Sequence, residues 1–252
     1  MNTVTSEKLT KLKEKIQLMM NKAENTPYPA EAQAFQEHAE RLMVRYGITA
    51  AQLDAEASRS SQKQESIVEK KMVFKGSYRK QEFQGLAQIG HVWPGITILK
   101  QIDGNSINGF VIGHESDVES VISMMNSLLI QVNVARLSWW KTVKDTKDWI
   151  PSEAYLERRT YTLAWMRAVA NRFKSLFQEE SVEAGTGTDL VLASRQDQVN
   201  DWVGEKYPSL RESRGRLHTG SSESVRAGAA GGARADLGQR NKVSQSRRGM
   251  IG

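Results

Sequence analysis

The 252-residue sequence contains no cysteine, only five prolines, and few aromatic side chains, at 7% of the chain. The lack of cysteine excludes disulfides, thiolate zinc sites, iron–sulfur clusters and cysteine nucleophiles, and it fits a reducing compartment. No apolar run approaches the ~18 residues that a membrane-spanning helix needs, and residues 1–15 lack the apolar core of a signal peptide. We therefore expect a cytoplasmic protein without membrane contact.

Common catalytic signatures are missing as well. The sequence has no Gly-Lys-Ser/Thr of a phosphate-binding loop and no Gly-x-Ser-x-Gly of a nucleophile elbow. The Gly-Thr-Gly at 185–187 lacks the strand before it and the helix after it that a dinucleotide fingerprint requires. We expect no cofactor. What is present is an ordinary globular composition, with 39% hydrophobic and 25% charged residues.

Charge is unevenly distributed along the chain. Residues 211–252 contain nine basic and three acidic residues, so this segment alone accounts for the net charge of +6. The 26 basic and 26 acidic residues of 1–210 cancel. Any general attraction to a polyanion is therefore expected to come mainly from the C-terminal segment.

Residues 6–24 and 29–46 have the apolar spacing of amphipathic helices, because apolar side chains recur at steps of three and four. The two apolar faces consist of Leu9, Leu12, Ile16, Met19 and Ala23, and of Phe35, Ala39, Leu42, Met43 and Tyr46. Gly47 suits a helix stop, and Thr49 with Gln52 forms a capping box for a short third helix. Two such helices joined by a short loop favour an antiparallel hairpin, so we expect a helical hairpin domain at 1–57.

The run KLKEKIQLMMNKAENTPYPAEAQAFQEHAERLMVRYGI resembles the bacterial and phage domain of unknown function 2786, over about residues 7–55. The matching features are the Lys/Ile/Leu-rich first helix, the KAENTPYPAEAQAF junction and the AERLMVRYGI ending. The resemblance implies the hairpin fold and no particular activity. Members of this family often continue into an α/β region with a G…SDVE segment, which residues 65–180 resemble.

A second region at 65–182 mixes strand and helix signals. The segments 66–75 and 95–113 predict strands, and the second contains Asp-Gly-Asn-Ser, a turn sequence suited to a hairpin. Apolar stripes predict helices at 77–93, 118–135 and about 152–180.

A further helix is expected at 188–208, before a basic tail at 211–252 rich in glycine, alanine, serine and arginine. The expected fold class is α+β and mainly helical. It comprises an N-terminal helical hairpin, a small antiparallel sheet packed with long helices, and the basic C-terminal tail.

One polar cluster lies on the second predicted helix: Glu37, His38, Glu40 and Arg41. Helical spacing predicts a Glu37–Arg41 ion pair, worth about 0.2–0.5 kcal/mol. A metal site needs three or four converging ligands, and no second histidine lies at helical spacing. We interpret the cluster as a solvated helix face.

The stretch FVIGHESDVES at 110–120 is the strongest candidate for chemistry, because active sites are common at strand-to-helix junctions. Ser116 and Glu119 fit a capping box, and Asp117 would lie in the first helical turn, where carboxylates are favoured. A zinc-protease His-Glu-x-x-His motif fails, since position 118 is valine. If a site exists here, His114, Glu115 and Asp117 are the catalytic candidates, and His91 and His114 are the candidate metal ligands.

Two segments are candidates for nucleic-acid binding. In SWWKTVKDTKDW, aromatic side chains are interleaved with lysines in a way that can stack bases and meet phosphates, although core packing or a contact with a partner protein explains the tryptophans better. In the tail, spaced arginines suit electrostatic binding, but residues 222–237 would also form a small-residue helix docked on the body, and an inert tail is the third alternative. The candidate residues are Arg211, Arg214, Arg216, Arg226, Arg234, Arg240, Lys242, Arg247, Arg248, Trp140, Lys141 and Lys144.

The sequence favours a non-enzymatic accessory protein of a phage or mobile element, in the host cytoplasm if phage-encoded, that contacts nucleic acid mainly through its tail. One alternative is a metal-dependent hydrolase-like enzyme with a site near residues 114–117. Another is an assembly protein that binds other subunits. The sequence does not set the oligomeric state.

Overall fold

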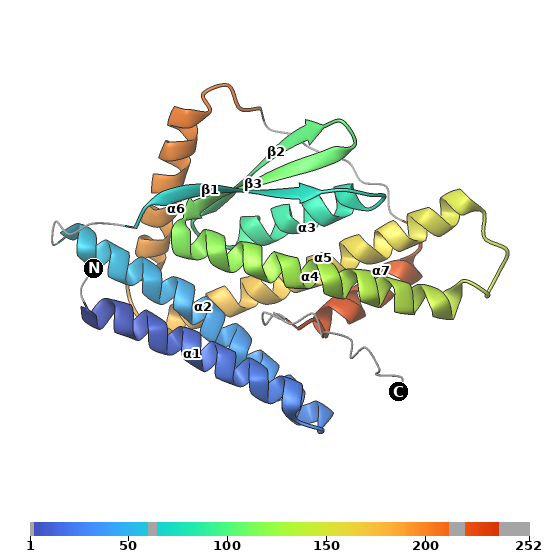
Figure 1. Ribbon diagram of the computed structural model, residues 1–252, viewed down its shortest axis with the longest axis horizontal. Helices are drawn as coiled ribbons and strands as arrows, with labels where there is room; N and C mark the ends of the chain where they lie inside the picture. The colour runs from blue at the N-terminus through green and yellow to red at the C-terminus, as the bar shows by residue number, and fades with distance from the viewer. Residues whose placement is uncertain (1–2, 60–64, 212–219, 237–252) are drawn as a thin grey trace, which may run out of the picture.

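The computed structural model describes residues 3–59, 65–211 and 220–236. Within these ranges the fold is α+β and mainly helical, with seven helices and one three-stranded antiparallel sheet, as the sequence predicted. Figure 1 shows the N-terminal hairpin along one side of the molecule, the sheet along the opposite side, and long helices between them.

The N-terminal hairpin consists of α1 (Thr3–Asn25) and α2 (Pro29–Arg59). Pro29 opens α2, a position where its missing N–H costs no helical hydrogen bond. The predicted stop at Gly47 and the third helix after it are wrong, because α2 continues through both. Burial of Ile48 and Ala51 extends the apolar face and outweighs the cost of about 1 kcal/mol for a glycine inside a helix.

The sheet has the order β1–β3–β2. Its strands are β1 (Ile67–Phe74), β2 (Ile96–Asp103) and β3 (Ser106–His114), and both pairings are antiparallel. One face packs on α3 (Arg79–Val92) and α4 (Glu115–Val143), and α6 (Thr188–Lys206) covers part of the other. The predicted hairpin at 95–113 is confirmed, and Gly104 takes a positive φ of 53° in its turn.

The helices α4 and α5 (Pro151–Glu183) form the central layer. Their buried side chains join those of α2, α3 and the sheet in one core, which includes Trp93, Leu128, Met166 and Phe173. Among the described residues, α4 is the one helix long and apolar enough to cross a membrane by composition. Core helices meet the same test, and α4 buries one side against the rest of the fold.

The last described segment is α7 (Ser222–Ala233), which packs along α5. Gly228 and Gly232 face it, and an added Cβ would lie only 2.4 Å from Tyr161 O and 2.2 Å from Trp165 O respectively. At the start of α7, the Glu157 carboxylate accepts hydrogen bonds from Ser221 N and Ser221 Oγ. Of the three alternatives predicted for the tail, α7 therefore matches the helix of small residues docked on the body.

Candidate functional site

The start of α4 differs from the predicted capping box. His114 is the N-cap residue and makes no capping side-chain bond. Ser116 instead directs both its backbone N–H and its hydroxyl to Glu65, with Ser116 Oγ 3.1 Å from Glu65 Oε2. Glu119 pairs with Lys70 across 3.3 Å. The start of α4 is thus capped by the carboxylate of Glu65, two residues before β1, and the positive end of the helix dipole stabilises this negative charge.

A buried arginine joins four elements at this junction. Arg195 of α6 donates from Nε to Asp117 Oδ2 at 2.8 Å, from Nη1 to Asp54 Oδ2 at 3.2 Å, and from Nη2 to Glu65 Oε2 at 2.7 Å. The guanidinium also reaches Ser116 Oγ at 3.3 Å. We call Arg195, Asp54, Glu65, Ser116 and Asp117 the Arg195 cluster.

The cluster holds three carboxylates around one cation, in a setting where Arg195 and Asp117 are each 3% exposed. Burial raises the pKa of Asp117 above its ordinary value, against the opposing effect of Arg195 and of the Trp93 Nε1 hydrogen bond at 3.2 Å. Burial would also raise the pKa of Glu65, but Arg195 and Ser116 outweigh it and lower that pKa. Arg195 is therefore held charged by its carboxylate partners, and burial alone would have lowered its pKa.

His114 borders the Arg195 cluster without joining its centre. Its Nε2 lies 3.2 Å from Gln198 Oε1 and 3.6 Å from Asp54 Oδ2, and its buried Nδ1 has no hydrogen-bond partner among the described atoms. Burial lowers the pKa of His114, followed by repulsion from Arg195. This imidazole is therefore held neutral at pH 7.

The structure brings two of the three catalytic candidates to one place. His114 and Asp117 both reach the Arg195 cluster, whereas Glu115 is exposed. His91 is exposed near the end of α3. Within residues 3–59, 65–211 and 220–236, no group of three or more His, Asp or Glu side chains could hold a metal ion. The Arg195 guanidinium lies between the three carboxylates, at the position where a metal ion would have to bind.

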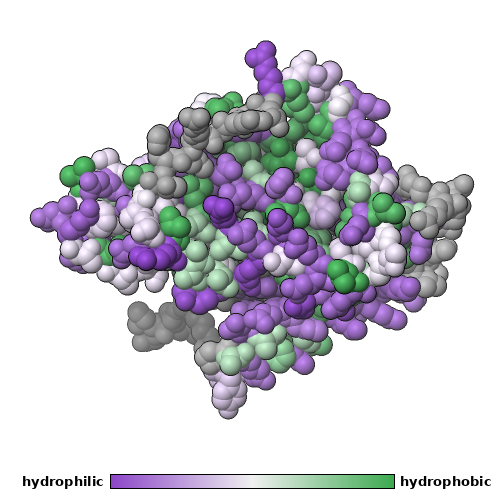
Figure 2. All heavy atoms as spheres, turned by 180° about the vertical axis from the view of Figure 1, so that it is seen from behind, coloured by the Kyte–Doolittle hydropathy of each residue, from purple (hydrophilic) through white to green (hydrophobic). Residues whose placement is uncertain are grey.

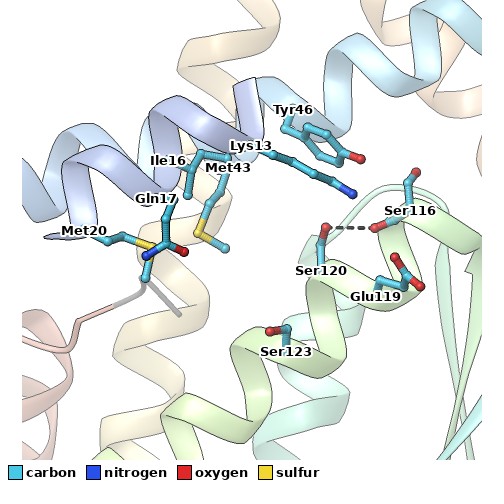
Figure 3. Close-up of a pocket in the computed structure, with 10 residues that line it drawn as sticks. All are labelled: Lys13, Ile16, Gln17, Met20, Met43, Tyr46, Ser116, Glu119, Ser120 and Ser123. Carbon is cyan, nitrogen blue, oxygen red and sulfur yellow. Dashed lines mark hydrogen bonds between the residues drawn. The ribbon is translucent and has the colours of Figure 1, made fainter. Parts of the chain in front are cut away.

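A pocket of about 370 Å³ lies beside the cluster, between the N-terminal hairpin and α4. Figure 3 shows Lys13 and Tyr46 on the hairpin side and Ser116, Ser120 and Ser123 on the α4 side. The Lys13 Nζ lies 5.3 Å from the Tyr46 ring centroid, a cation–π arrangement. The thioethers of two methionines complete an apolar end. The pocket is mixed in character, and it lacks a converging set of acids and bases.

The predicted solvated cluster on α2 is partly wrong. Glu40 is 2% exposed and accepts two hydrogen bonds from Arg172 Nη2, at 2.5 and 2.6 Å. Burial raises the pKa of Glu40 to about 7, against the opposing effect of Arg172. Arg41 pairs with Glu179 on α5 at 2.7 Å, and not with Glu37 as helical spacing predicted. These contacts fasten the hairpin to α5.

The predicted Trp/Lys segment closes the turn between α4 and α5. Trp139 stacks on Tyr161 with ring centroids 4.7 Å apart. Trp140 lies between Trp139 and Trp149, with the Arg158 guanidinium 4.9 Å from its ring. The rings therefore contact one another, and Trp139, Trp140 and Trp149 are all half-buried. Lys141 is exposed, and Lys144 pairs with Asp145 at 3.4 Å.

Three of the nine predicted tail cations lie in the described part of the chain. Arg211 is exposed beyond α6, and Arg226 and Arg234 are exposed on or just after α7. The other six fall outside the described residues: Arg214, Arg216, Arg240, Lys242, Arg247 and Arg248.

Sequence reasoning overlooked a row of lysines on α1. Lys8, Lys11, Lys15 and Lys22 recur at steps of three, four and seven, so they share one helix face, and all four are exposed. Within the described ranges, no carboxylate forms an ion pair with any of them. This lysine face lies next to the predicted apolar face of α1, and the Lys22 Nζ lies 5.4 Å from the centroid of the Phe35 ring on α2. We call these four residues the α1 lysine row.

The surface seen from behind is mostly polar, with apolar side chains in separate small groups (Figure 2). No curated protein and no solved structure matches the chain. The model of a family described as a protein of unknown function, DUF2786, matches residues 11–50. The matched residues cover most of α1 and most of α2, so the similarity to this family lies within the N-terminal helical hairpin.

Proposed function

We propose that the protein is a non-enzymatic accessory protein of a phage or mobile element that contacts nucleic-acid backbones through cations at its two ends. The observation that carries this proposal is the α1 lysine row. Exposed cations without carboxylate partners are the groups that can replace the counterions of a phosphate backbone.

The spacing of the α1 lysine row suits a polyanion. At 1.5 Å per residue, the four side chains span roughly 21 Å along the helix. Neighbouring lysines at i,i+3 and i,i+4 repel one another by a few tenths of a kcal/mol. That repulsion disappears when phosphates lie between them, so the row favours an anion of similar length over isolated small anions.

The C-terminal cations extend this contact. Arg226 and Arg234 are exposed while the small residues of α7 hold the helix against α5. Docking of α7 thus leaves both guanidinium groups available. Six further cations at or beyond residue 214 add to the positive charge of this end of the sequence.

The alternative of a metal-dependent hydrolase has less support. The Arg195 cluster would need its central guanidinium displaced before its carboxylates could bind a divalent ion. Removing one partner of a buried ion pair typically costs 3–5 kcal/mol. The Arg195 cluster is better suited to fix α2, α4 and α6 around the sheet.

The proposal is tested by filter-binding titrations of the full-length chain against single- and double-stranded DNA at several salt concentrations. The first variant replaces Lys8, Lys11, Lys15 and Lys22 with glutamine. The second ends the chain after Asp236, so that α7 stays in place. We expect weak, sequence-tolerant binding that both variants reduce. The slope of log K against log salt should decrease in magnitude by roughly 0.7–0.9 for each lost phosphate contact.

A control variant with the same change in net charge separates a local site from general attraction. Lys71, Lys75, Lys80 and Lys174 are exposed outside α1, and their replacement by glutamine should change the slope much less. Equal binding by the full-length chain, both test variants and the control would reject the proposal.

A further inference from the structure

The pocket beside the Arg195 cluster contains a cation without an opposite charge. Two charged side chains line this pocket, Lys13 of α1 and Glu119 of α4. Glu119 pairs with Lys70 at 3.3 Å. Within residues 3–59, 65–211 and 220–236, no carboxylate pairs with Lys13, whose ammonium lies 5.3 Å from the centroid of the Tyr46 ring. An anionic ligand would supply the charge that Lys13 lacks.

Hydrogen-bond donors gather at the same end of the pocket. Figure 3 shows the Lys13 ammonium and the Tyr46 hydroxyl beside the first turns of α4, near Ser116 and Ser120. Burial raises the pKa of the Tyr46 hydroxyl, against the opposing effect of Lys13, so this phenol is a neutral donor at pH 7. The Ser116 hydroxyl is engaged by Glu65. The Ser120 hydroxyl bonds the Ser116 carbonyl of its own helix and can turn toward a ligand. A carboxylate has enough lone pairs to accept from all three groups: the ammonium, the phenol and the Ser120 hydroxyl.

The other end of the pocket is apolar. Ile16 and Met20 of α1 and Met43 of α2 line it, and Figure 3 shows both thioethers there. Gln17, the polar lining residue at this end, donates from Nε2 to Asn21 Oδ1 at 3.0 Å along α1. Methionine side chains are flexible and fill irregular space around apolar groups. This end therefore suits an unbranched alkyl chain.

The separation of the two ends sets the length of the ligand. Lys13 and Met20 are seven residues apart on α1, which is about 10 Å along the helix axis. An extended chain of eight carbons has about the same length. The pocket volume of about 370 Å³ also lies within the range of small-molecule sites, which begins at roughly 300 Å³.

We propose that the pocket between α1 and α4 binds a medium-chain carboxylate, with the carboxylate at Lys13 and the alkyl chain between Met20 and Met43. This site is separate from the α1 lysine row. Lys13 is two residues from Lys11 and from Lys15, so it lies about 200° around the helix from each of them. Because α1 packs mainly on α2, a ligand that contacts both α1 and α4 would fasten α1 to the rest of the fold.

The test is isothermal titration calorimetry of the full-length protein with sodium octanoate. We expect a dissociation constant on the order of 0.1–1 mM, as for a ligand of about ten heavy atoms. The neutral 1-octanol and the cationic octylammonium have the same chain, and each should bind at least about tenfold more weakly. Acetate keeps the carboxylate and lacks the chain, so it should not bind measurably.

Two substitutions locate the binding in the pocket. Lys13→Gln keeps the length of the side chain and removes its charge, so it should raise the dissociation constant for octanoate about tenfold or more. Ser120→Leu fills the polar end and should abolish binding. Lys174→Gln makes the same charge change at an exposed position on α5, and it should leave the constant unchanged. Thermal unfolding confirms that each variant is folded.

Hydrogen exchange measures whether the ligand fastens α1. A ligand that binds only while α1 is in place slows exchange through the opening of α1 by the factor 1 + [L]/Kd, about tenfold at a concentration of ten times Kd. Amides of α1 should show this protection with octanoate, and amides of α7 should not. Lys13→Gln should lose the protection at the same octanoate concentration.

Several results would overturn the proposal. One is the absence of octanoate binding up to about 10 mM. Others are equal affinities for octanoate and 1-octanol, or octanoate binding that is unchanged in both Lys13→Gln and Ser120→Leu. Tighter binding of octylammonium than of octanoate would assign the pocket to a cation and reject a carboxylate ligand.

Discussion

The Arg195 cluster and the α1 lysine row use the same kinds of side chain in opposite ways. In the cluster, one buried guanidinium is matched by carboxylates from three segments of the chain. In the row, four exposed ammonium groups share a helix face without carboxylate partners in the described ranges. The difference indicates that a charged residue must be judged by its partners, because Asp117 is matched by Arg195 whereas the four lysines have no matching carboxylate in the described ranges.

The largest expected effect comes from removing the centre of the cluster. Arg195→Met leaves three carboxylates without their cation, so the free energy of unfolding in urea should fall by about 3–5 kcal/mol. Arg167→Met, at an exposed position on α5, should change it by less than about 0.5 kcal/mol.

If Arg195→Met does not fold, Arg195→Lys provides the second measurement. Lysine keeps the charge and loses the fork of donors, so an intermediate loss of stability is expected. Equal stability of wild type and Arg195→Met would contradict the structural role of the cluster.

The buried Glu40–Arg172 pair tests whether burial or ion pairing has the larger effect on the pKa of Glu40. The pKa of Glu40 is about 7 in the folded protein and near 4.5 when unfolded. The folded state therefore retains a proton that the unfolded state has released, and this stability is present below about pH 4.5 and lost as the pH rises through 7. Relative to Glu40→Gln, the wild type should lose roughly 3 kcal/mol over that range. A stability difference that is independent of pH would show that Arg172 keeps Glu40 ionised throughout.

Two glycine substitutions test how closely α7 packs on α5. Gly232→Ala brings a Cβ to 2.2 Å from Trp165 O, so we expect a loss of about 1–3 kcal/mol from overpacking. Gly204→Ala in α6, where nothing lies within 4 Å of the added Cβ, should gain up to about 1 kcal/mol. If both substitutions raise the melting temperature, α7 does not pack on α5 as described.

The sequence predicted the elements of the fold well and the charged contacts poorly. Apolar periodicity located both hairpin helices, the β-hairpin and the long helices, because each pattern is local. Gly47 was misleading, since tertiary burial of Ile48 carries the helix past it. A glycine stop is only a local preference.

The sequence predicted only part of the candidate site, because sequence patterns are local and the contacts of the Arg195 cluster are not. His114 and Asp117 stand out at a strand-to-helix junction. Arg195 lies 78 residues from Asp117, 130 from Glu65 and 141 from Asp54. No local pattern connects these positions, so the capping-box interpretation of Ser116 could not be corrected from sequence.

The smallest expected effect on stability belongs to the α1 lysine row. Changing Lys15 to glutamine relieves repulsion from Lys11 at i−4, and no carboxylate lies three or four residues from Lys15 in the sequence. We therefore expect a gain of about 0.2–0.5 kcal/mol in low salt that disappears in high salt. Chemical denaturation at two salt concentrations measures this. A loss of stability in low salt would indicate that Lys15 has a favourable partner.

The most direct test of a nucleic-acid contact through the α1 lysine row is a lysine-reactivity footprint. Surface amines are acetylated with and without DNA, and the products are quantified by mass spectrometry. We predict that DNA protects Lys8, Lys11, Lys15 and Lys22 and leaves Lys71, Lys75, Lys80 and Lys174 as reactive as before. Protection confined to the second group, or no protection of the first at DNA concentrations that saturate binding, would contradict a nucleic-acid contact through α1.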